Sequence, residues 1–283
     1  MNTELQTKYD RLCRILAQMG DVVIGMSGGV DSVLLAKVAA DVLGEKAVAV
    51  TADSPSLPRR ELREAQELAR QIGVRHIVIK TQEVSDPRYA ANPVNRCYFC
   101  KTELFTHLEK LAGELGFRWI AYGENQDDDG DHRPGRQAAG EHGVRAPLKE
   151  AGLSKADIRA LAEHFNLPVW NKPAFACLGS RFPYGSRITV EKLAQVEAAE
   201  EFLWQAGFRQ FRVRHHDTIA RIEVAPDDMP RLLDMAPQVV AHFRQLGYTY
   251  VTLDLAGYQR GSMNQAEPAL IPIVNIPAGA GRK

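Results

Sequence analysis

Two glycines and two serines surround an aspartate in the hexapeptide SGGVDS, residues 27–32. Gly28 and Gly29 let backbone N–H groups approach an anion with no side chain in the way. Ser27 and Ser32 supply hydroxyls, and a helix beginning here adds aligned donors and the positive end of its dipole. Asp31 fits such a pocket if Mg²⁺ lies between its carboxylate and a phosphate. The segment therefore predicts a phosphate-binding loop, and the missing lysine excludes the GxxxxGK[ST] type.

Three of the four cysteines could act together. Cys97 and Cys100 lie in NRCYFC, and Cys177 lies in PAFACLGSRFPYG. Cys13, in RLCRIL, is more typical of helix packing. Three thiolates are too few for a closed structural zinc site made of thiolates alone, but they could hold an iron–sulfur cluster with one iron free of protein ligands. A Cys-x-x-Cys redox pair and a set of buried free thiols stay open as alternatives.

A pair of arginines could bind a second anion. In FRVR, Arg212 and Arg214 lie on one face of a predicted strand, because side chains alternate along a strand. Two neighbouring guanidinium groups suit a phosphate. The alternative is a solvated face, in which Arg221 and Glu223 of the next strand form cross-strand ion pairs.

The first half of the chain alternates strands with amphipathic helices. Strands are predicted at 21–26, 47–53, 76–82 and 119–125, and helices at 33–44, 59–73 and 98–115. This alternation predicts a parallel, doubly wound α/β sheet. Ligands of such sheets bind at the carboxyl ends of the strands.

The second half has a different pattern. Residues 127–140 are polar and glycine-rich, which predicts a long loop, and Ser154 with Asp157 predicts a capping box before a helix to Asn166. A helix at 190–206, two antiparallel strands within 210–225, a helical region at 227–246 and a strand at 248–255 indicate a smaller α+β domain. We expect domains at 1–179 and 180–263 and a flexible tail at 264–283.

The bulk composition sets the class of protein. The chain has 283 residues, 45% of them apolar and 25% charged, with a formal net charge of zero. We expect a soluble cytoplasmic protein with no membrane or nucleic-acid partner, because no apolar run reaches roughly 20 residues and no global positive field exists. Paired cysteines in the cytosol more often bind metal or do chemistry than form structural disulfides.

The hexapeptide SGGVDS matches the SGGxDS signature of the PP-loop pyrophosphatase superfamily. This resemblance implies that ATP is split into AMP and pyrophosphate while a carboxylate or carbonyl oxygen is adenylated. It implies a catalytic role for Asp31. The residues expected to bind ATP are Ser27, Gly28, Gly29, Asp31 and Ser32, with Asp53 and Gly123 bordering the adenosine at carboxyl ends of strands.

A longer set of motifs resembles the LarE family. NRCYFCK, GENQDDDGDHRPG, ACLGSRFPYG, RVRHHDTIARIE and YVTLDLAGY follow SGGVDS in the order found there. The resemblance implies adenylation of a pyridinium dicarboxylic acid mononucleotide and sulfur insertion to give a thiocarboxylate, within nickel-pincer nucleotide biosynthesis. It also implies a homo-oligomer.

The family resemblance assigns the remaining site residues. Cys97, Cys100 and Cys177 match members that hold a [4Fe–4S] cluster, with Cys177 catalytic; other members sacrifice one cysteine near this position. Residues resembling the substrate-phosphate site are Ser180, Arg181, Glu200, Arg212 and Arg214. An amide synthase, a transfer-RNA thiolase and a non-enzymatic, ATP-binding redox sensor remain as alternatives.

Overall fold

The larger part of the molecule is built on a parallel sheet. A computed structural model describes residues 1–130, 134–173 and 176–259. Four parallel strands lie in the order β3-β2-β1-β4. Their bounds are β1 Val22–Gly25, β2 Ala47–Asp53, β3 Arg75–Lys80 and β4 Ile120–Tyr122. The predicted α/β fold class is confirmed, and the strands are shorter than predicted at several ends.

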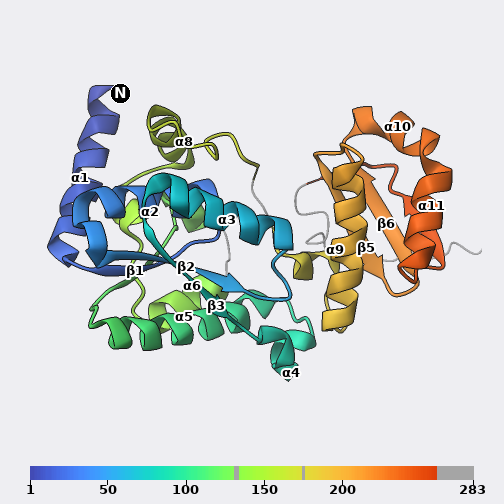
Figure 1. Cartoon of the computed structure of the whole chain (residues 1–283), viewed down its shortest axis with the longest axis horizontal. Coiled ribbons are helices and arrows are strands. Elements are labelled where there is room, and N and C mark those ends of the chain that lie inside the picture. The colour runs from blue at the N-terminus through green and yellow to red at the C-terminus, as the bar shows by residue number, and fades with distance from the viewer. Residues whose placement is uncertain (131–133, 174–175, 260–283) are drawn as a thin grey trace, which may run out of the picture.

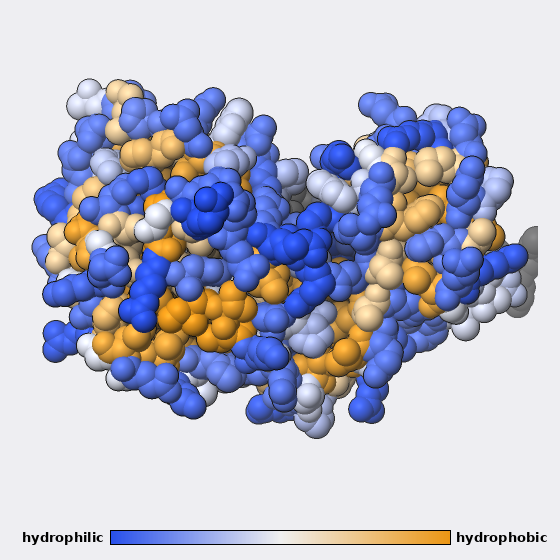
Figure 2. Space-filling model, in the orientation of Figure 1, coloured by the Kyte–Doolittle hydropathy of each residue, from blue (hydrophilic) through white to orange (hydrophobic). Residues whose placement is uncertain are grey.

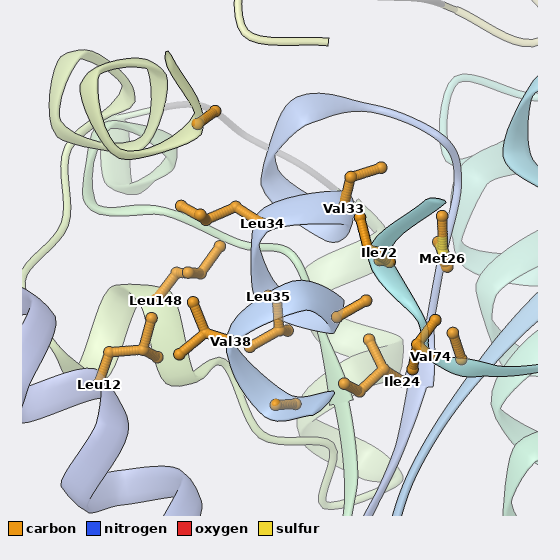
Figure 3. Close-up of a cluster of buried hydrophobic side chains, with 14 of the residues drawn as sticks. Leu12, Ile24, Met26, Val33, Leu34, Leu35, Val38, Ile72, Val74 and Leu148 are labelled. Atoms are coloured by element: carbon orange, nitrogen blue, oxygen red, sulfur yellow. The ribbon is translucent and has the colours of Figure 1, made fainter. Parts of the chain in front are cut away.

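Helices cover both faces of this sheet (Figure 1). One face carries α1 (Thr3–Met19), α2 (Val30–Leu43), α3 (Arg59–Ile72) and α8 (Lys155–His164), and the other carries α5 (Arg96–Leu115) and α6 (Pro134–Glu141). Figure 3 shows Leu12, Ile24, Leu35 and Ile72 pointing toward one another from four different elements. The sheet is buried on both sides, which explains the nearly continuous apolar runs of its central strands.

The predicted loop at 127–140 is wrong over most of its length. A 3₁₀ turn spans Gln126–Gly130 and α6 follows at Pro134–Glu141. Pro134 suits the first position of a helix, because the N–H that proline lacks would have no acceptor within the helix there. Ala138 and Ala139 are buried against the α5 side of the sheet. Packing of these alanines against the rest of the domain thus stabilises a helix that the glycine-rich sequence does not predict.

The smaller C-terminal part holds a three-stranded sheet. Strands β5 (Phe211–His216) and β6 (Ile219–Val224) are antiparallel, and β7 (Tyr250–Leu253) pairs with β6 in parallel. α9 (Val190–Gln205), α10 (Met229–Asp234) and α11 (Ala236–Gln245) pack on it around a core of its own. Figure 2 shows a notch between the two parts.

Short elements complete the described chain. They are α4 (Pro87–Ala90), α7 (Pro147–Glu150) and 3₁₀ turns at Gly44–Lys46, Glu83–Ser85, Leu178–Arg181 and Pro226–Asp228. The capping box of Ser154 and Asp157 is confirmed at the start of α8. Cys13 is half-buried and packs against the main core, as expected for a helix-packing residue. The predicted tail at 264–283 lies outside the described residues.

No helix among the described residues is long and apolar enough to cross a membrane.

Candidate functional site: a phosphate loop facing three cysteines

The glycine-rich loop joins β1 to α2 through a left-handed turn. Gly28 has a φ of +76°, a conformation that a side chain makes costly. Ser32 fixes the turn, because its Oγ accepts from the Ser27 N–H at 3.1 Å and donates to the Gly29 carbonyl at 3.1 Å. The serines of the motif therefore shape the loop, and the N-terminus of α2 opens beside it.

Gly123 lies directly against the start of α2. A Cβ at this position would approach the Ser32 nitrogen to 2.7 Å and the Asp31 carbonyl carbon to 3.0 Å. These neighbours are backbone atoms, so no side-chain rotation could relieve the contact. Gly123 was predicted to border adenosine; in the structure it permits close packing of the end of β4 on the phosphate loop.

Asp31 is held by two side chains from the other end of the domain. Asn125 Nδ2 donates to one carboxylate oxygen at 3.1 Å, and Lys155 forms an ion pair with the other. Lys155 stands at the first position of α8, directly after the capping Ser154. Sequence reasoning did not find Asn125 or Lys155. The capping box could have indicated that α8, and with it Lys155, begins near the carboxyl ends of the strands, where ligands of such sheets bind.

A second cation approaches the same loop. Lys172 Nζ lies 2.8 Å from a Glu61 carboxylate oxygen and 2.9 Å from one of Glu64, and 3.4 Å from the Gly28 carbonyl oxygen. Glu61 is buried in the first turn of α3. Two lysines from distant parts of the sequence therefore surround a loop that carries none of its own.

Asp53 ends β2 at the boundary between the two parts of the molecule. It forms an ion pair with Arg59, whose backbone N–H donates to Glu197 of α9 at 2.5 Å. A cavity of about 360 Å³ opens here. Its walls include Asp53, Arg59, Lys80, Thr81, Ala194 and Glu197. The predicted nucleotide-binding aspartate thus lines a cavity between the two parts.

The three cysteines come from two segments. Cys97 and Cys100 lie in the first turns of α5, and Cys177 precedes the 3₁₀ turn at Leu178–Arg181. Cys97 is exposed, and Cys100 and Cys177 are half-buried. Burial raises the pKa of Cys100, and the nearby Glu83 raises it further. Cys100 packs against the cluster that contains Leu178, the residue after Cys177. In the described part of the chain, however, no three Cys, His, Asp or Glu side chains are arranged to hold a metal ion.

Hydrogen bonds join these two segments. The Arg96 Nη1 donates to the Gly179 carbonyl at 2.8 Å and also to Asn92 Oδ1. The Asn92 side chain donates to the Pro183 carbonyl at 2.7 Å, and the Asn92 backbone carbonyl accepts from the Gly185 N–H at 2.9 Å. Arg96 and Asn92 are buried. Both were missed from sequence, although Arg96 directly precedes Cys97.

Arg181 connects the Cys177 segment to the C-terminal sheet. Its guanidinium is fully buried and donates twice to Glu200, at 2.8 and 2.9 Å. It also donates to the carbonyls of Ala176 and Cys177, at 2.7 and 3.1 Å. Burial opposes ionisation of Glu200, but the Arg181 guanidinium lowers the pKa of that carboxyl below its usual value. Glu200 further accepts from the Val213 N–H at 3.0 Å.

Arg214 and Arg212 lie in different environments. Arg214 donates twice to buried Glu223, at 2.9 and 2.8 Å, and once to the Ser180 carbonyl at 3.0 Å. A cross-strand ion pair therefore forms with Glu223, as in the solvated-face alternative, but the pair is buried and not solvated. Arg212 is half-buried and donates to the hydroxyl of Tyr258 at 3.2 Å. Ser180 lies between these groups, its Oγ accepting from Arg181 at 2.8 Å.

Comparison with known proteins places the chain in a family. A family model described as NAD synthase matches residues 6–91. An uncharacterized protein of Synechocystis sp. is 48% identical over 92% of this chain and 98% of its own length. The pyridinium-3,5-bisthiocarboxylic acid mononucleotide synthase of Lactiplantibacillus plantarum is 38% identical over 92% of this chain and 95% of its own.

A tRNA-specific 2-thiouridylase of Xanthobacter autotrophicus is 32% identical, over 54% of this chain and 49% of that protein. The match to the mononucleotide synthase runs through both the phosphate-loop domain and the C-terminal sheet. The chain therefore belongs to the LarE family of PP-loop proteins.

Proposed function

We propose that this protein is an ATP-dependent sulfur transferase that converts a carboxylate of a pyridinium dicarboxylic acid mononucleotide into a thiocarboxylate. The observation that carries the proposal is 38% identity, over 92% of the chain, to a synthase named for the bisthiocarboxylic product. The geometry supports it. The loop after β1 and the cysteines after β3 follow the carboxyl ends of parallel strands in one sheet, so both lie toward one edge.

The first step is adenylation. A carboxylate oxygen of the acceptor attacks the α-phosphorus of ATP, and the bond to pyrophosphate breaks as pyrophosphate leaves with its electron pair. The backbone around Gly28 and Gly29 and the N-terminus of α2 bind phosphate oxygens. Lys155 and Lys172 supply positive charge beside the loop. Asp31 offers half-buried carboxylate oxygens, which suit Mg²⁺; the ion, when bound, would neutralise phosphate charge.

The second step replaces oxygen with sulfur. Hydrosulfide attacks the carbonyl carbon of the acyl adenylate, and AMP leaves with the electrons of the broken C–O bond. We assign Cys97, Cys100 and Cys177 as ligands of a [4Fe–4S] cluster, whose chemistry when bound is to supply the sulfide. The chemistry of the donors supports this assignment, because thiolates are the usual cluster ligands and the buried Arg96 guanidinium beside them offsets negative charge. The three thiols would have to close around the cluster when it binds, since they are not arranged as a metal site in the described part of the chain.

The acceptor's own phosphate binds on the C-terminal sheet. Arg212 and the Ser180 hydroxyl contact it in our proposal, since Arg212 is half-buried and forms no ion pair with a carboxylate among the described residues. Arg181 and Arg214 position this site, because each guanidinium is already bonded to a buried glutamate, Glu200 or Glu223. Because two of the three guanidinium charges are neutralised by glutamates, the charge of Arg212 remains to attract an anionic phosphate.

Acceptor-dependent release of pyrophosphate tests the adenylation step. Purified protein with Mg²⁺-ATP should release pyrophosphate only when the dicarboxylic acid mononucleotide is present, and the product should contain sulfur by mass spectrometry. Asp31→Asn should reduce release at least tenfold. Asp41→Asn is the matched control, because Asp41 lies on the same helix, is exposed and forms an ion pair with Lys37, away from the loop. The assignment would be overturned if pyrophosphate were released equally with and without the acceptor, or if the Asp31→Asn variant were as active as wild type.

Iron and sulfide counts after anaerobic purification test the cluster. Replacing any of the three cysteines with Ala should remove both iron and activity, while Cys13→Ala should keep both. A sacrificial mechanism has different consequences. Only Cys177 would be essential, turnover would stop after one event, and the protein would lose the mass of one H₂S. Iron-free but active protein with that mass loss would contradict the cluster.

A second candidate function is thiolation of transfer RNA. The similarity to a tRNA-specific 2-thiouridylase favours it, although that match covers 54% of the chain. Transfer RNA in place of the mononucleotide should give no pyrophosphate. Cytoplasmic location and homo-oligomerisation remain predictions; light scattering of the purified protein would measure the oligomeric state.

A further inference from the structure

Tyr89 carries a buried hydroxyl that has no hydrogen-bond partner among the described residues. The residue lies in α4 and is 1% exposed, packed in a cluster that includes Leu178 and Phe182. Buried polar atoms are nearly always hydrogen-bonded, so an unpartnered hydroxyl in such a place calls for an explanation. The apolar side chains that surround its ring do not provide one.

The hydroxyl lies beside the segment that carries Cys177, near the Arg96 side chain. A Cβ added to Gly179 would come within 2.9 Å of the Tyr89 oxygen, and Gly179 is two residues from Cys177. The half-buried Cys100 packs against the same cluster. A phenol keeps its proton at neutral pH, so the hydroxyl can act as a donor.

The nearby segments carry sulfur, because Cys100 packs against the cluster that contains Tyr89 and Leu178, and Leu178 directly follows Cys177. A neutral thiol is a weak acceptor, whereas a thiolate or a sulfide carries charge and accepts well. The glycine at 179 keeps the space between the hydroxyl and the Cys177 segment free of a side chain. The donor lies on α4, Cys100 lies on α5, and Cys177 and Gly179 lie on a third segment, so three parts of the chain meet here.

We propose that Tyr89 is a positioning residue of the three-cysteine site, and that its hydroxyl donates a hydrogen bond to sulfur held between Cys100 and Cys177. The proposal rests on the cluster assignment made above. Hydrogen bonds to sulfur stabilise the more negative, reduced form of a cluster and so raise its reduction potential. Tyr89 thereby holds the sulfur in place and tunes its charge without reacting itself.

The chain offers a matched control. Tyr248 is also almost fully buried, and its hydroxyl also lacks a partner among the described residues. It lies in the core of the C-terminal sheet, with its ring 5.9 Å from that of Phe243 and 5.6 Å from that of His215. Tyr248→Phe thus removes the same atom from the same kind of environment, away from the thiols.

The experiment compares Tyr89→Phe and Tyr248→Phe in full-length protein, first without iron and then after anaerobic reconstitution. Without iron, Tyr89→Phe should unfold at the wild-type temperature or higher, because the lost hydroxyl has no hydrogen-bond partner among the described residues. With the cluster, it should show a more negative reduction potential and release iron to a chelator at least threefold faster. Tyr248→Phe should match wild type in both cluster measurements.

Two outcomes would overturn the inference alone. If wild type and Tyr89→Phe share the same potential and the same rate of iron release, the hydroxyl does not contact the cluster. If the iron-free Tyr89→Phe protein unfolds well below both wild type and Tyr248→Phe, the hydroxyl has a structural partner. Wild-type protein that takes up no iron would overturn the cluster assignment and this inference together.

Discussion

At the scale of single residues, Gly123 shows how closely the phosphate loop is packed. The contact is between backbone atoms of two elements, the end of β4 and the first turn of α2. Its effect differs from that of Gly28, where a left-handed φ is the constraint. The same loop requires both glycines: Gly28 for the left-handed conformation of the loop, and Gly123 for the close approach of β4 to it.

Gly123→Ala should therefore weaken ATP binding. The added methyl group cannot fit at 2.7 Å from the Ser32 nitrogen, so the start of α2 must shift. Overpacking of this kind costs roughly 1–3 kcal/mol of folding stability. Isothermal titration with ATP should give a dissociation constant at least tenfold above wild type.

Gly113→Ala provides the control for this substitution. A Cβ at Gly113 meets nothing within 4 Å, and the residue lies inside α5. Alanine is favoured over glycine in a helix by about 1 kcal/mol, so this variant should be as stable as wild type or more so. Unchanged ATP affinity in Gly123→Ala would show that the loop does not form the phosphate site.

At the scale of elements, His215 makes the C-terminal sheet sensitive to pH. Its Nδ1 accepts from the Asp217 N–H at 3.2 Å, so its Nε2 carries the proton and faces Gln195 Oε1 at 2.9 Å. If Nδ1 took up a second proton, it could no longer accept from the Asp217 N–H, and the two N–H groups would repel each other. Burial lowers the pKa of His215 from 6.5 to about 4, with the nearby charge of Lys192 adding to the effect.

The sheet should lose stability as the pH falls. Because the folded pKa lies below the unfolded value, the unfolded state takes up the proton first. The stabilisation is complete above pH 6.5 and declines as the pH falls toward about 4. Urea unfolding followed by the fluorescence of Trp204, in α9, should show this decline. His215→Gln should show a smaller decline between these values; an identical pH profile would contradict the assignment to His215.

At the scale of the whole molecule, one ion pair links the cysteine segment to the C-terminal part. Arg181 bonds to the carbonyl of Cys177, while its partner Glu200 lies on α9 and accepts from the backbone of β5. Loss of this pair would disconnect the proposed sulfur site from the proposed phosphate site. The two sites need a fixed separation, because one acceptor molecule must reach both.

Glu200→Ala should destabilise the protein by about 3–5 kcal/mol, because it leaves a fully buried guanidinium without its counter-charge. Chemical denaturation followed by circular dichroism would measure the loss. Glu67→Ala is the comparison, since the Glu67–Arg70 pair is exposed and should contribute little. Equal unfolding midpoints for the two variants would mean that the Arg181–Glu200 pair does not support the fold.

Local patterns in the sequence determined much of this protein. The strand and helix alternation predicted the parallel sheet, and Ser154 with Asp157 predicted the start of α8. The motif SGGVDS predicted a loop between β1 and α2. These predictions succeed because each depends on the spacing of nearby residues, through backbone conformation, capping and apolar periodicity.

Only the tertiary structure decided which distant residues meet. Lys155 pairs with Asp31, and Arg96 reaches the Gly179 carbonyl, although each pair is far apart in sequence. The helix at Pro134–Glu141 likewise depends on burial of two alanines beside α5. Such contacts arise from chain topology and packing, so no local pattern encodes them. The same reason separates Arg212 from Arg214: the strand pattern places both on one face, and only packing gives Arg214 a buried carboxylate partner.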